Sequence, residues 1–393
     1  MPKPKVLSVM HDVPLQSSFL TEKFVRLGKE VDMHMLVWDS EKNAQLFATS
    51  HSITRSKIHL GGSKHTLSLM NVFTLLYLSI FNSRIRKFLF DGSFIKNVKK
   101  VITYLPIFSL KPDIIHFEFG ILARETVMLK KLTDAKMIAS FRGYDMYYTG
   151  LDDKDYYKNV WQHADGFHFL GNDLKQHAMK RGYTTNKIEA IIPPAIDTDF
   201  FTPTKAEKAD DVFNIVSVGR LTWRKGYDNA LQAMRHLKDQ GIPFHYTIVG
   251  DGEHLRAMQF MIQDLRLEKN ITLAGSLNRD AIKILLNNSH LFLQASVSEG
   301  FCNAVIEAQA MGLPVVATDA GGLPENVVDG VTGFIVSRWD AKAMADKIAW
   351  CYQNRNTLVQ MGEQGKQRVK EHFRVEDQIN KFVEFYNRVY AAS

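Results

Sequence analysis

The chain has 393 residues, of which 45% are hydrophobic and 23% charged, and its formal net charge is +7. This length predicts two or three domains, and the composition is typical of a soluble globular protein. The two cysteines, Cys302 and Cys351, are too few for a disulfide framework and lack metal-ligand spacing.

The N-terminal residues do not resemble a secretory signal. Their apolar stretch extends only from Val6 to Met10 and ends at His11 and Asp12, which predicts a buried strand rather than the apolar region of a signal peptide. Together with the low cysteine content, this favours a cytoplasmic location.

Short apolar runs alternate along the chain with helical patterns such as 229–240 and 253–267. Most runs are continuous, as in strands buried on both faces of a sheet, so we expect an α/β fold with parallel, doubly wound sheets. The expected strands are 6–10, 33–38, 114–119, 137–140, 166–170 and 188–192 in the first half, and 213–219, 245–250, 271–274, 291–294, 314–318 and 333–336 in the second.

One region of the N-terminal half combines apolar runs with basic residues. The run 67–81 carries no charge, but it is too short and too interrupted by Ser and Asn for a membrane-spanning helix. One interpretation is a core helix with solvated basic neighbours, and the other is an amphipathic face that binds an anionic membrane surface. No aromatic-interleaved basic motif supports a nucleic-acid partner. The basic residues are Arg84, Arg86, Lys87, Lys96, Lys99 and Lys100.

A segment rich in Pro, Thr and charged residues, 193–211, divides the two halves. We therefore expect an N-terminal Rossmann-like lobe over 1–195, a linker over 196–211 and a C-terminal Rossmann-like lobe over 212–370. Ligands of such sheets bind at the carboxyl ends of the strands, which predicts an active site between the two lobes.

The first motif with chemical content follows the expected strand 213–219. The strand runs into Gly219, Arg220 and Lys225 follow in a loop, and a helix is expected to begin near Tyr227. Arginine and lysine in a loop that leads to a helix start can bind a diphosphate with charge and N–H donors. Ordinary solvated loop charges are the alternative interpretation.

The second motif follows the expected strand 291–294. Gly300 lets the backbone approach a ligand, and a helix beginning near Cys302 or Asn303 would present free N–H groups. Glu299 precedes this helix, and Glu307 lies one turn inside it among small apolar residues. A carboxylate with such neighbours usually has a specific partner, which argues against a simple helix cap or solvated face.

These residues and their surroundings resemble the retaining glycosyltransferases of family 4, which have the two-lobed GT-B fold. Glu299 and Glu307 are separated by seven residues, and further matching segments surround them. The resemblance covers nearly all of residues 213–340. The further segments are VGDG at 249–252, GLPVVAT at 312–318, GGLPE at 321–325 and VDGVTGF at 328–334.

The resemblance implies a nucleotide-sugar site in the C-terminal half. Arg220 and Lys225 would hold the diphosphate without a metal ion or cofactor, Glu307 the ribose hydroxyls and Glu299 the transferred sugar. UDP is the first candidate nucleotide and GDP the second. The remaining donor-site candidates are Gly219, Gly250, Leu277, Gly300, Phe301, Cys302, Asn303 and Ala304.

The N-terminal half matches the family more loosely. Its segment KPDIIHFEFG at 111–120 resembles a strand ending in His-x-His, with His116 as the first histidine and Glu118 in place of the second. The segment SFRGYD at 140–145 resembles His-Gly-x-Asp, with Arg142 in the histidine position and Asp145 at the end. These four residues are candidates for the sugar or acceptor side, where Arg142 would contact a phosphate or an acidic acceptor.

The opening loop 13–19 has Ser17 and Ser18 where many relatives have a Gly-Gly pair, and both serines are candidates for the acceptor side. The loop is closer to members that build bacterial exopolysaccharide or lipopolysaccharide. The acceptor implied is a glycan or a lipid-linked glycan, with a peripheral contact to an anionic inner membrane as an accompanying hypothesis.

The helical pattern of the tail, 371–390, resembles the family's final helix, which returns to the N-terminal lobe.

The activity implied is hexosyl transfer with retention of anomeric configuration, with Arg220 and Lys225 stabilising the departing diphosphate. Two alternatives remain open from the sequence. One is a nucleotide-sugar epimerase on the same scaffold, and the other is a non-catalytic protein that binds a nucleotide sugar.

Overall fold

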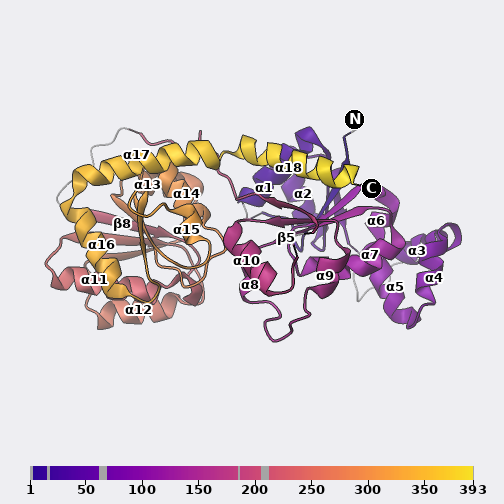
Figure 1. Cartoon of the computed structure of the whole chain (residues 1–393), viewed down its shortest axis with the longest axis horizontal. Helices are drawn as coiled ribbons and strands as arrows, with labels where there is room; N and C mark the ends of the chain where they lie inside the picture. Colours follow the sequence, from indigo (N-terminus) through magenta and orange to yellow (C-terminus); the bar gives the residue numbers. More distant parts are fainter. Residues whose placement is uncertain (1–2, 16–17, 62–68, 185, 205–211, 393) are drawn as a thin grey trace. The chain divides into compact units, whose positions relative to one another are not determined.

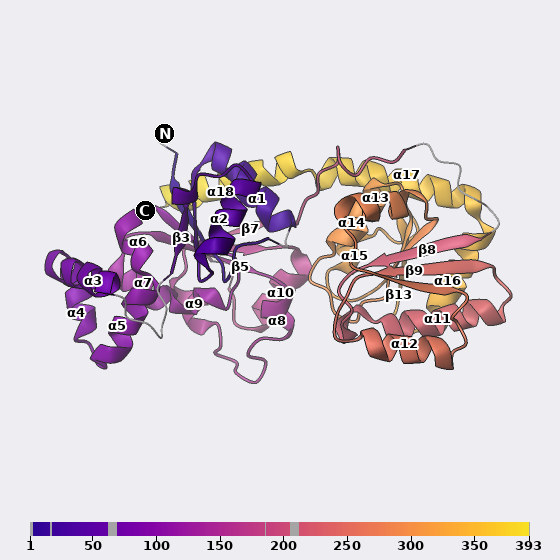
Figure 2. The ribbon, with the colours of Figure 1, turned by 180° about the vertical axis from the view of Figure 1, so that it is seen from behind.

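The computed structural model describes residues 3–15, 18–61, 69–184, 186–204 and 212–392. The chain forms two compact units. Unit 1 comprises Met1–Leu170, Lys175–Ile192 and Ile379–Ser393, and unit 2 comprises Gly171–Leu174 and Pro193–Gln378. Each unit contains one parallel sheet with helices on both sides (Figures 1 and 2).

Unit 1 is built on a seven-stranded sheet with the order β3-β2-β1-β4-β5-β6-β7, in which all neighbouring strands are parallel. The strands are β1 (Lys5–Val9), β2 (Asp32–Val37), β3 (Ile58–Leu60), β4 (Ile114–Phe117), β5 (Lys136–Phe141), β6 (Gly166–Phe169) and β7 (Ile188–Ile191). Its longer helices are α1 (Ser18–Glu30), α2 (Glu41–Ser50), α3 (Leu69–Phe81) and α5 (Phe94–Thr103). Shorter ones are α4 (Ser83–Leu89), α6 (Leu105–Leu110), α7 (Thr126–Leu132), α8 (Gly143–Tyr147) and α9 (Lys158–His163), with 3₁₀ turns η1 (Arg55–Lys57) and η2 (Leu122–Glu125). Helix α10 (Asn172–Lys180) belongs to unit 1 from Lys175 onward.

Unit 2 is built on a six-stranded parallel sheet with the order β10-β9-β8-β11-β12-β13. The strands are β8 (Phe213–Val218), β9 (Phe244–Val249), β10 (Ile271–Gly275), β11 (Leu291–Gln294), β12 (Val315–Thr318) and β13 (Gly333–Val336). The helices are α11 (Tyr227–Asp239), α12 (Leu255–Asp264), α13 (Arg279–Asn287), α14 (Asn303–Ala310), α15 (Leu323–Asn326), α16 (Ala341–Gln353) and α17 (Arg355–His372), and η3 (Trp223–Lys225) is a 3₁₀ turn.

Two hydrophobic cores lie on opposite faces of the unit 2 sheet. Ile215 of β8 packs with residues of α11, α12 and α16, whereas the next residue, Val216, packs with residues of α13, α14 and α17. Adjacent strand residues point to opposite faces, so both faces must be apolar when both are covered. This explains the continuous apolar runs in the sequence and confirms the expected doubly wound α/β fold.

All twelve expected strands are present, within one or two residues of the expected bounds. The strand that the sequence did not predict, β3, has three residues and includes His59, so its apolar signal is weak. Of the expected linker, residues 196–204 are part of unit 2: Ile196 and Phe201 are buried in one of its cores. The structure therefore places the boundary before Pro193, and 205–211 lie outside the described residues.

The final helix, α18 (Val375–Ala391), contributes residues from Ile379 onward to unit 1. Its side chains Phe382, Phe385, Tyr386 and Val389 are buried. Unit 1 is therefore assembled from both ends of the chain.

The interpretation of 67–81 as a core helix is wrong for the part that the structure describes. Helix α3 leaves Phe73, Tyr77, Ile80 and Phe81 more than half exposed. None of the helices in the described ranges is both long enough and apolar enough to span a membrane.

Candidate functional site

The loop after β8 carries the first group of candidate residues. It continues from Gly219 through η3 to Gly226, where α11 begins at Tyr227 as expected. Gly226 has a φ of 65°, and a Cβ atom there would lie 2.0 Å from the carbonyl oxygen of Ala295. Only glycine fits both the backbone angle and this close approach, so Gly226 fixes the position of the preceding Lys225 against the end of β11.

The loop after β11 carries the second group. Helix α14 begins at Asn303, and the backbone N–H of Cys302 donates a hydrogen bond to Oδ1 of Asn326 at 3.1 Å. The N–H of Gly322 donates to the carbonyl of Glu299 at 2.8 Å, and a Cβ atom at Gly322 would lie 2.2 Å from the carbonyl oxygen of Gly300. The loop that holds Glu299 is thus fixed by backbone packing against residues after β12.

The two loops enclose a pocket of about 320 Å³ at the carboxyl end of the unit 2 sheet. Nine predicted donor-site residues line it, whereas Gly250, Leu277 and Gly300 are not among its lining residues. Gly250 lies directly behind Gly219, since a Cβ atom at Gly250 would meet the Gly219 carbonyl. The lining residues are Val218, Gly219, Arg220, Thr222, Arg224, Lys225, Ser298, Glu299, Phe301, Cys302, Asn303, Ala304 and Glu307.

A short ion pair joins the two loops inside this pocket. Nζ of Lys225 lies 2.5 Å from Oε2 of Glu299, and the side chains are 20% and 15% exposed. Burial alone would lower the pKa of Lys225, but the Glu299 carboxylate outweighs that effect and raises it. Ser296 donates a second hydrogen bond to Oε2 of Glu299 at 3.3 Å. Lys225 is therefore a stable cation, and Glu299 is oriented by two partners.

Glu307 lies one turn inside α14 and is the second carboxylate of the pocket. Burial raises its pKa to about 7, although the positive charge of Arg279 at the start of α13 acts in the opposite direction. Its protonation state therefore changes near neutral pH. Burial also raises the pKa of the neighbouring Cys302 thiol to about 12, so this thiol is protonated and not a nucleophile.

The structure adds Arg224 to the candidate residues, together with Thr222 and Ser298. Arg224 lines the pocket, and its carbonyl accepts a hydrogen bond from the N–H of Val297 at 2.8 Å. The sequence contained the signal, since Arg224 directly precedes Lys225, but only the 3₁₀ turn shows that both side chains reach the same pocket. With Arg220, three cations line this pocket beside the N-terminus of α14.

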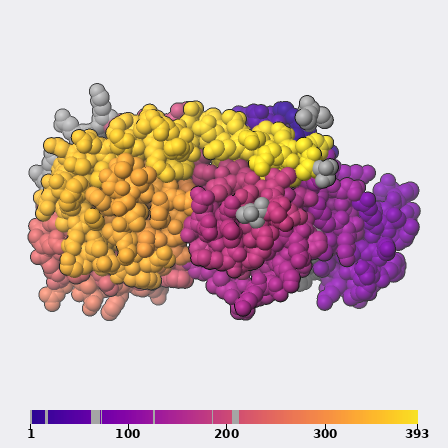
Figure 3. Space-filling view, viewed as in Figure 1, coloured from indigo at the N-terminus to yellow at the C-terminus, as the bar shows by residue number. Residues whose placement is uncertain are grey.

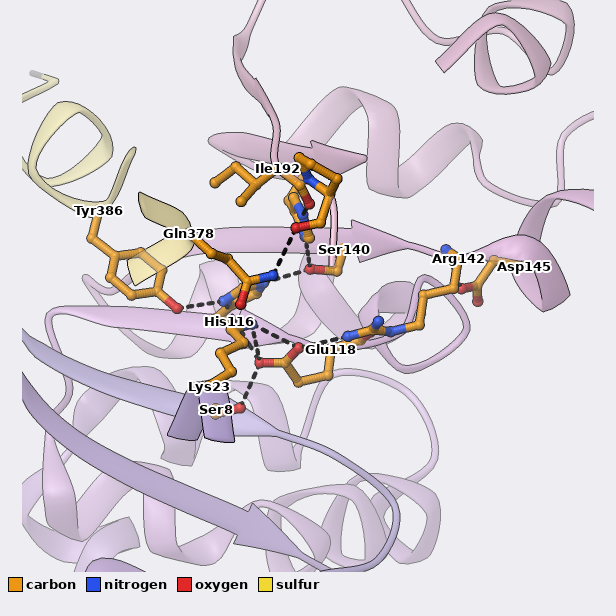
Figure 4. A network of polar contacts seen from close by, with 12 residues as sticks. Ser8, Lys23, His116, Glu118, Ser140, Arg142, Asp145, Ile192, Gln378 and Tyr386 are labelled. Carbon is orange, nitrogen blue, oxygen red and sulfur yellow. Dashed lines mark hydrogen bonds and ion pairs between the residues drawn. The ribbon is translucent and has the colours of Figure 1, made fainter. Parts of the chain in front are cut away.

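Four of the acceptor-side candidates form a buried polar network in unit 1 (Figure 4), namely His116, Glu118, Arg142 and Asp145. Glu118, at the carboxyl end of β4, accepts hydrogen bonds from Lys23 at 2.7 and 2.9 Å, from Ser8 at 2.9 Å and from Nη2 of Arg142 at 3.1 Å. Burial alone would raise the pKa of Glu118, but the charges of Lys23 and Arg142 outweigh it and lower the pKa. Glu118 is therefore ionised, with both cations as partners.

Arg142 is held within this network rather than exposed. It is 8% exposed, its Nε donates to the carbonyl of Glu118 at 2.9 Å, and its guanidinium lies near the rings of Phe19 and Phe119 at 4.8 and 5.0 Å. Asp145 caps the next helix, α8, by accepting from the N–H of Arg142 at 3.0 Å. The contact of Arg142 with a phosphate or an acidic acceptor stays a prediction.

His116 connects the network to the last helix. Its Nδ1 lies 2.8 Å from the hydroxyl of Tyr386 in α18, and its Nε2 lies 2.7 Å from Oγ of Ser140. Burial holds the pKa of His116 well below its ordinary value, so the ring is neutral. Both ring nitrogens thus bind protein groups. Of the remaining candidates, Ser17 lies outside the described residues and Ser18 is the first residue of α1.

Comparison with known proteins finds similar sequences for much of the chain. Residues 200–368 match the family model described as glycosyl transferases group 1. This part of unit 2 therefore resembles the group 1 glycosyltransferases. The chain is 32% identical over 201 residues to the putative colanic acid biosynthesis glycosyltransferase WcaL of Escherichia coli, covering 49% of each. It is 30% identical over 241 residues to the amylovoran biosynthesis glycosyltransferase AmsK of Erwinia amylovora, covering 59% of each. The matched part thus spans about half to three fifths of these relatives' length.

Solved structures resemble the chain in fold over nearly its whole length. A glycosyltransferase from Rickettsia africae superposes with a TM-score of 0.77 at 20% identity, over 100% of both chains. Anabaena Alr3699/HepE in complex with UDP superposes with a TM-score of 0.74 at 15% identity, over 98% of this chain and 100% of that one. These likenesses confirm the GT-B fold with two Rossmann-like units.

The pKa of Glu307 predicts a pH-dependent nucleotide affinity. If ribose hydroxyls donate to its carboxylate, binding requires the ionised form, so the affinity for UDP should rise as the pH increases through about 7 and then level off. Below the pKa the change should approach about tenfold per pH unit. Calorimetric titrations of the wild type and Glu307→Gln between about pH 5.5 and 8.5 measure it, with the range set around that pKa.

The phosphate groups of UDP also titrate, near pH 6 for a phosphate monoester, but they do so equally in both proteins. The difference between the two pH profiles therefore isolates Glu307. Parallel profiles would show that Glu307 does not bind the nucleotide.

The buried network predicts a large loss of stability for Glu118→Gln. This change leaves Lys23 and Arg142 buried without their carboxylate, which typically costs about 3–5 kcal/mol in the free energy of unfolding. Glu22→Gln is the matched control, because Glu22 pairs with Arg26 at a partly exposed site and such pairs contribute roughly 1 kcal/mol or less. Urea unfolding compares the two variants, and equal losses would contradict the account of the network.

Proposed function

We propose that this chain is a retaining glycosyltransferase that transfers a hexose from a nucleoside-diphosphate sugar to a glycan or lipid-linked glycan. The observation that carries the proposal is the pocket of unit 2. It combines Arg220, Arg224 and Lys225 with the first N–H groups of α14 and two carboxylates. Few ligands other than a sugar nucleotide require this set of cations and hydroxyl acceptors in one pocket of about 320 Å³.

A diphosphate needs positive charge and hydrogen-bond donors. Arginine provides a planar fork of donors, and lysine provides a compact charge. The N-terminus of a helix adds backbone N–H donors, which bind an anion without loss of side-chain entropy. Lys225 already has a carboxylate partner, so a phosphate would share this cation with Glu299 or replace it. The cations allow catalysis without a metal ion, because they supply the charge that a divalent ion provides in other enzymes.

The chemical step breaks the bond between the anomeric carbon and the diphosphate oxygen and forms a bond from that carbon to the acceptor oxygen. Negative charge develops on the departing diphosphate, and preorganised cations aimed at it lower the barrier. The acceptor hydroxyl transfers its proton to the leaving phosphate oxygen on the same face of the sugar, which retains the anomeric configuration. Neither Glu299 nor Glu307 is required as a nucleophile.

Glu299 and Glu307 account for recognition of the hydroxyl groups on the two sugar rings of the donor, the ribose and the transferred sugar. In this proposal Glu307 accepts from the ribose and Glu299 from the transferred sugar, while Glu299 also orients Lys225. The base contacts backbone near Gly250 and Leu277. UDP is the first candidate nucleotide, and the UDP in the Anabaena Alr3699/HepE structure supports it, with GDP second.

The printed names of the relatives support a role in bacterial polysaccharide biosynthesis. WcaL and AmsK are named for colanic acid and amylovoran biosynthesis, and another relative belongs to the human phosphatidylinositol N-acetylglucosaminyltransferase. These names favour a growing glycan or a lipid-linked acceptor. In this proposal the buried network of Glu118, Arg142 and His116 supports the acceptor-side loops of unit 1.

Removing one pocket cation tests the proposal. Lys225→Ala, Arg224→Ala or Arg220→Ala should lower the rate of sugar transfer by roughly two to three orders of magnitude, the effect of losing one strong transition-state donor. The control is Arg235→Ala, because Arg235 pairs with Asp239 on the surface of α11. The assay follows release of nucleoside diphosphate with and without a glycan acceptor.

Near-normal turnover of the Lys225→Ala variant would overturn the proposed site. Conversion of the donor sugar without an acceptor would indicate an epimerase instead. Nucleotide binding without release of diphosphate, with any acceptor, would indicate a binding protein.

A further inference from the structure

Helices α3, α4 and α5 lie together at one end of unit 1 (Figures 2 and 3) and expose large apolar side chains to solvent. We call it the tip surface. The rings of Tyr77 and Phe81 lie 4.7 Å apart, and those of Phe90 and Phe94 lie 5.4 Å apart. The tip surface comprises Phe73, Tyr77, Ile80, Phe81, Phe90 and Ile95, which are between 61 and 73% exposed.

The three helices beneath this surface are well packed. Ile85, Leu89 and Val101 are buried, and Nδ2 of Asn97 donates to the carbonyls of Phe88 and Asp91 at 2.8 and 2.7 Å, which fixes the turn between α4 and α5. The exposed aromatic side chains are therefore held by an ordered scaffold. Contiguous exposed apolar surface of this kind marks an interaction site in a folded protein.

The charge around the tip surface is strongly positive. Residues 69–104 contain six Lys and Arg residues and one acidic residue, Asp91, which gives a net charge of +5. Arg86, Lys87, Lys96 and Lys99 are exposed. Aromatic side chains among basic ones are typical of surfaces that insert into the interface of an anionic bilayer.

A polar hollow of about 560 Å³ adjoins the tip surface at the amino ends of β4 and β5. Phe81 and Arg84 line it together with Lys111 and Lys136. Its acidic residues already have partners: Asp134 accepts from Arg84 at 2.6 Å, and Asp113 accepts from the N–H of Lys5 at 2.7 Å. The hollow is large enough for a lipid headgroup beside the apolar residues that would enter the acyl region.

We propose that the tip surface docks the protein onto an anionic phospholipid membrane, with the headgroup phosphates near Arg84, Lys111 and Lys136. The aromatic residues enter the interface, and the basic residues of α4 and α5 lie at the level of the headgroups. This role is independent of the donor chemistry in unit 2. It would retain the enzyme where a lipid-linked acceptor is found.

Vesicle co-sedimentation of the full chain tests the proposal. The wild type should bind vesicles of equal phosphatidylcholine and phosphatidylglycerol at least tenfold more strongly than vesicles of phosphatidylcholine alone. The binding should weaken at high salt, because each basic residue near an anionic surface contributes roughly fivefold and is screened by ions. Equal binding to both vesicles, or to neither, would overturn the proposal.

Matched variants test whether the tip surface is the part of the protein that binds the vesicles. Phe73→Ser/Ile80→Ser/Phe81→Ser and Lys96→Glu/Lys99→Glu should each reduce binding to the anionic vesicles at least tenfold. The controls are Phe260→Ser and Arg256→Glu/Lys269→Glu, which alter exposed residues of unit 2 in the same ways and should bind as the wild type does. Unchanged binding by the tip variants would overturn the proposal.

Two further measurements distinguish membrane docking from a damaged nucleotide site and from self-association. Calorimetry with UDP should give the same affinity for the wild type and the tip variants, so a failure of the nucleotide site would be recognised independently. Sedimentation without vesicles should show the same molecular mass for all of them. If the wild type is an oligomer and the triple Ser variant is a monomer, the tip surface binds a second copy of the chain instead of a membrane.

Discussion

The ion pair between Lys225 and Glu299 is the interaction on which the unit 2 site depends. It joins the loop after β8 to the loop after β11, which are 74 residues apart in sequence but adjacent at the carboxyl end of a parallel sheet. Gly226 and Gly322 fix these loops by close backbone contacts, so both charged side chains are positioned before any ligand binds. A phosphate that enters the pocket meets a lysine whose geometry is already set, and preorganisation of this kind is the main source of electrostatic catalysis.

Buried charge is used differently in the two units. In unit 2, Lys225, Arg220 and Arg224 line an open pocket, where Lys225 pairs with Glu299. In unit 1, Lys23 and Arg142 are almost fully buried and directed at Glu118, while His116 binds Tyr386 of the last helix. The first arrangement leaves cations beside a pocket, as the proposed diphosphate site requires, whereas the second joins β4 and α18 within unit 1.

Much of the fold was predictable because strands buried on both faces give continuous apolar runs, and all strands except the short β3 were found this way. Most donor-side residues were also predictable, because they lie in loops directly after such strands. The ion pairs between distant residues could not be predicted. Lys23 and Glu118 are 95 residues apart, and no local sequence pattern shows that one balances the charge of the other. The apolar run 67–81 was ambiguous for a similar reason: burial depends on what packs against a helix, and α3 leaves one face uncovered.

The central claim is that the unit 2 pocket binds a diphosphate through its cations. Calorimetric titration of the full chain with UDP and with uridine tests it most directly, because the two ligands differ only in the diphosphate. Charge-assisted hydrogen bonds contribute roughly 1.5–3 kcal/mol each, so two of them predict that UDP binds about 100-fold more tightly or better. Equal affinities for UDP and uridine would contradict the account.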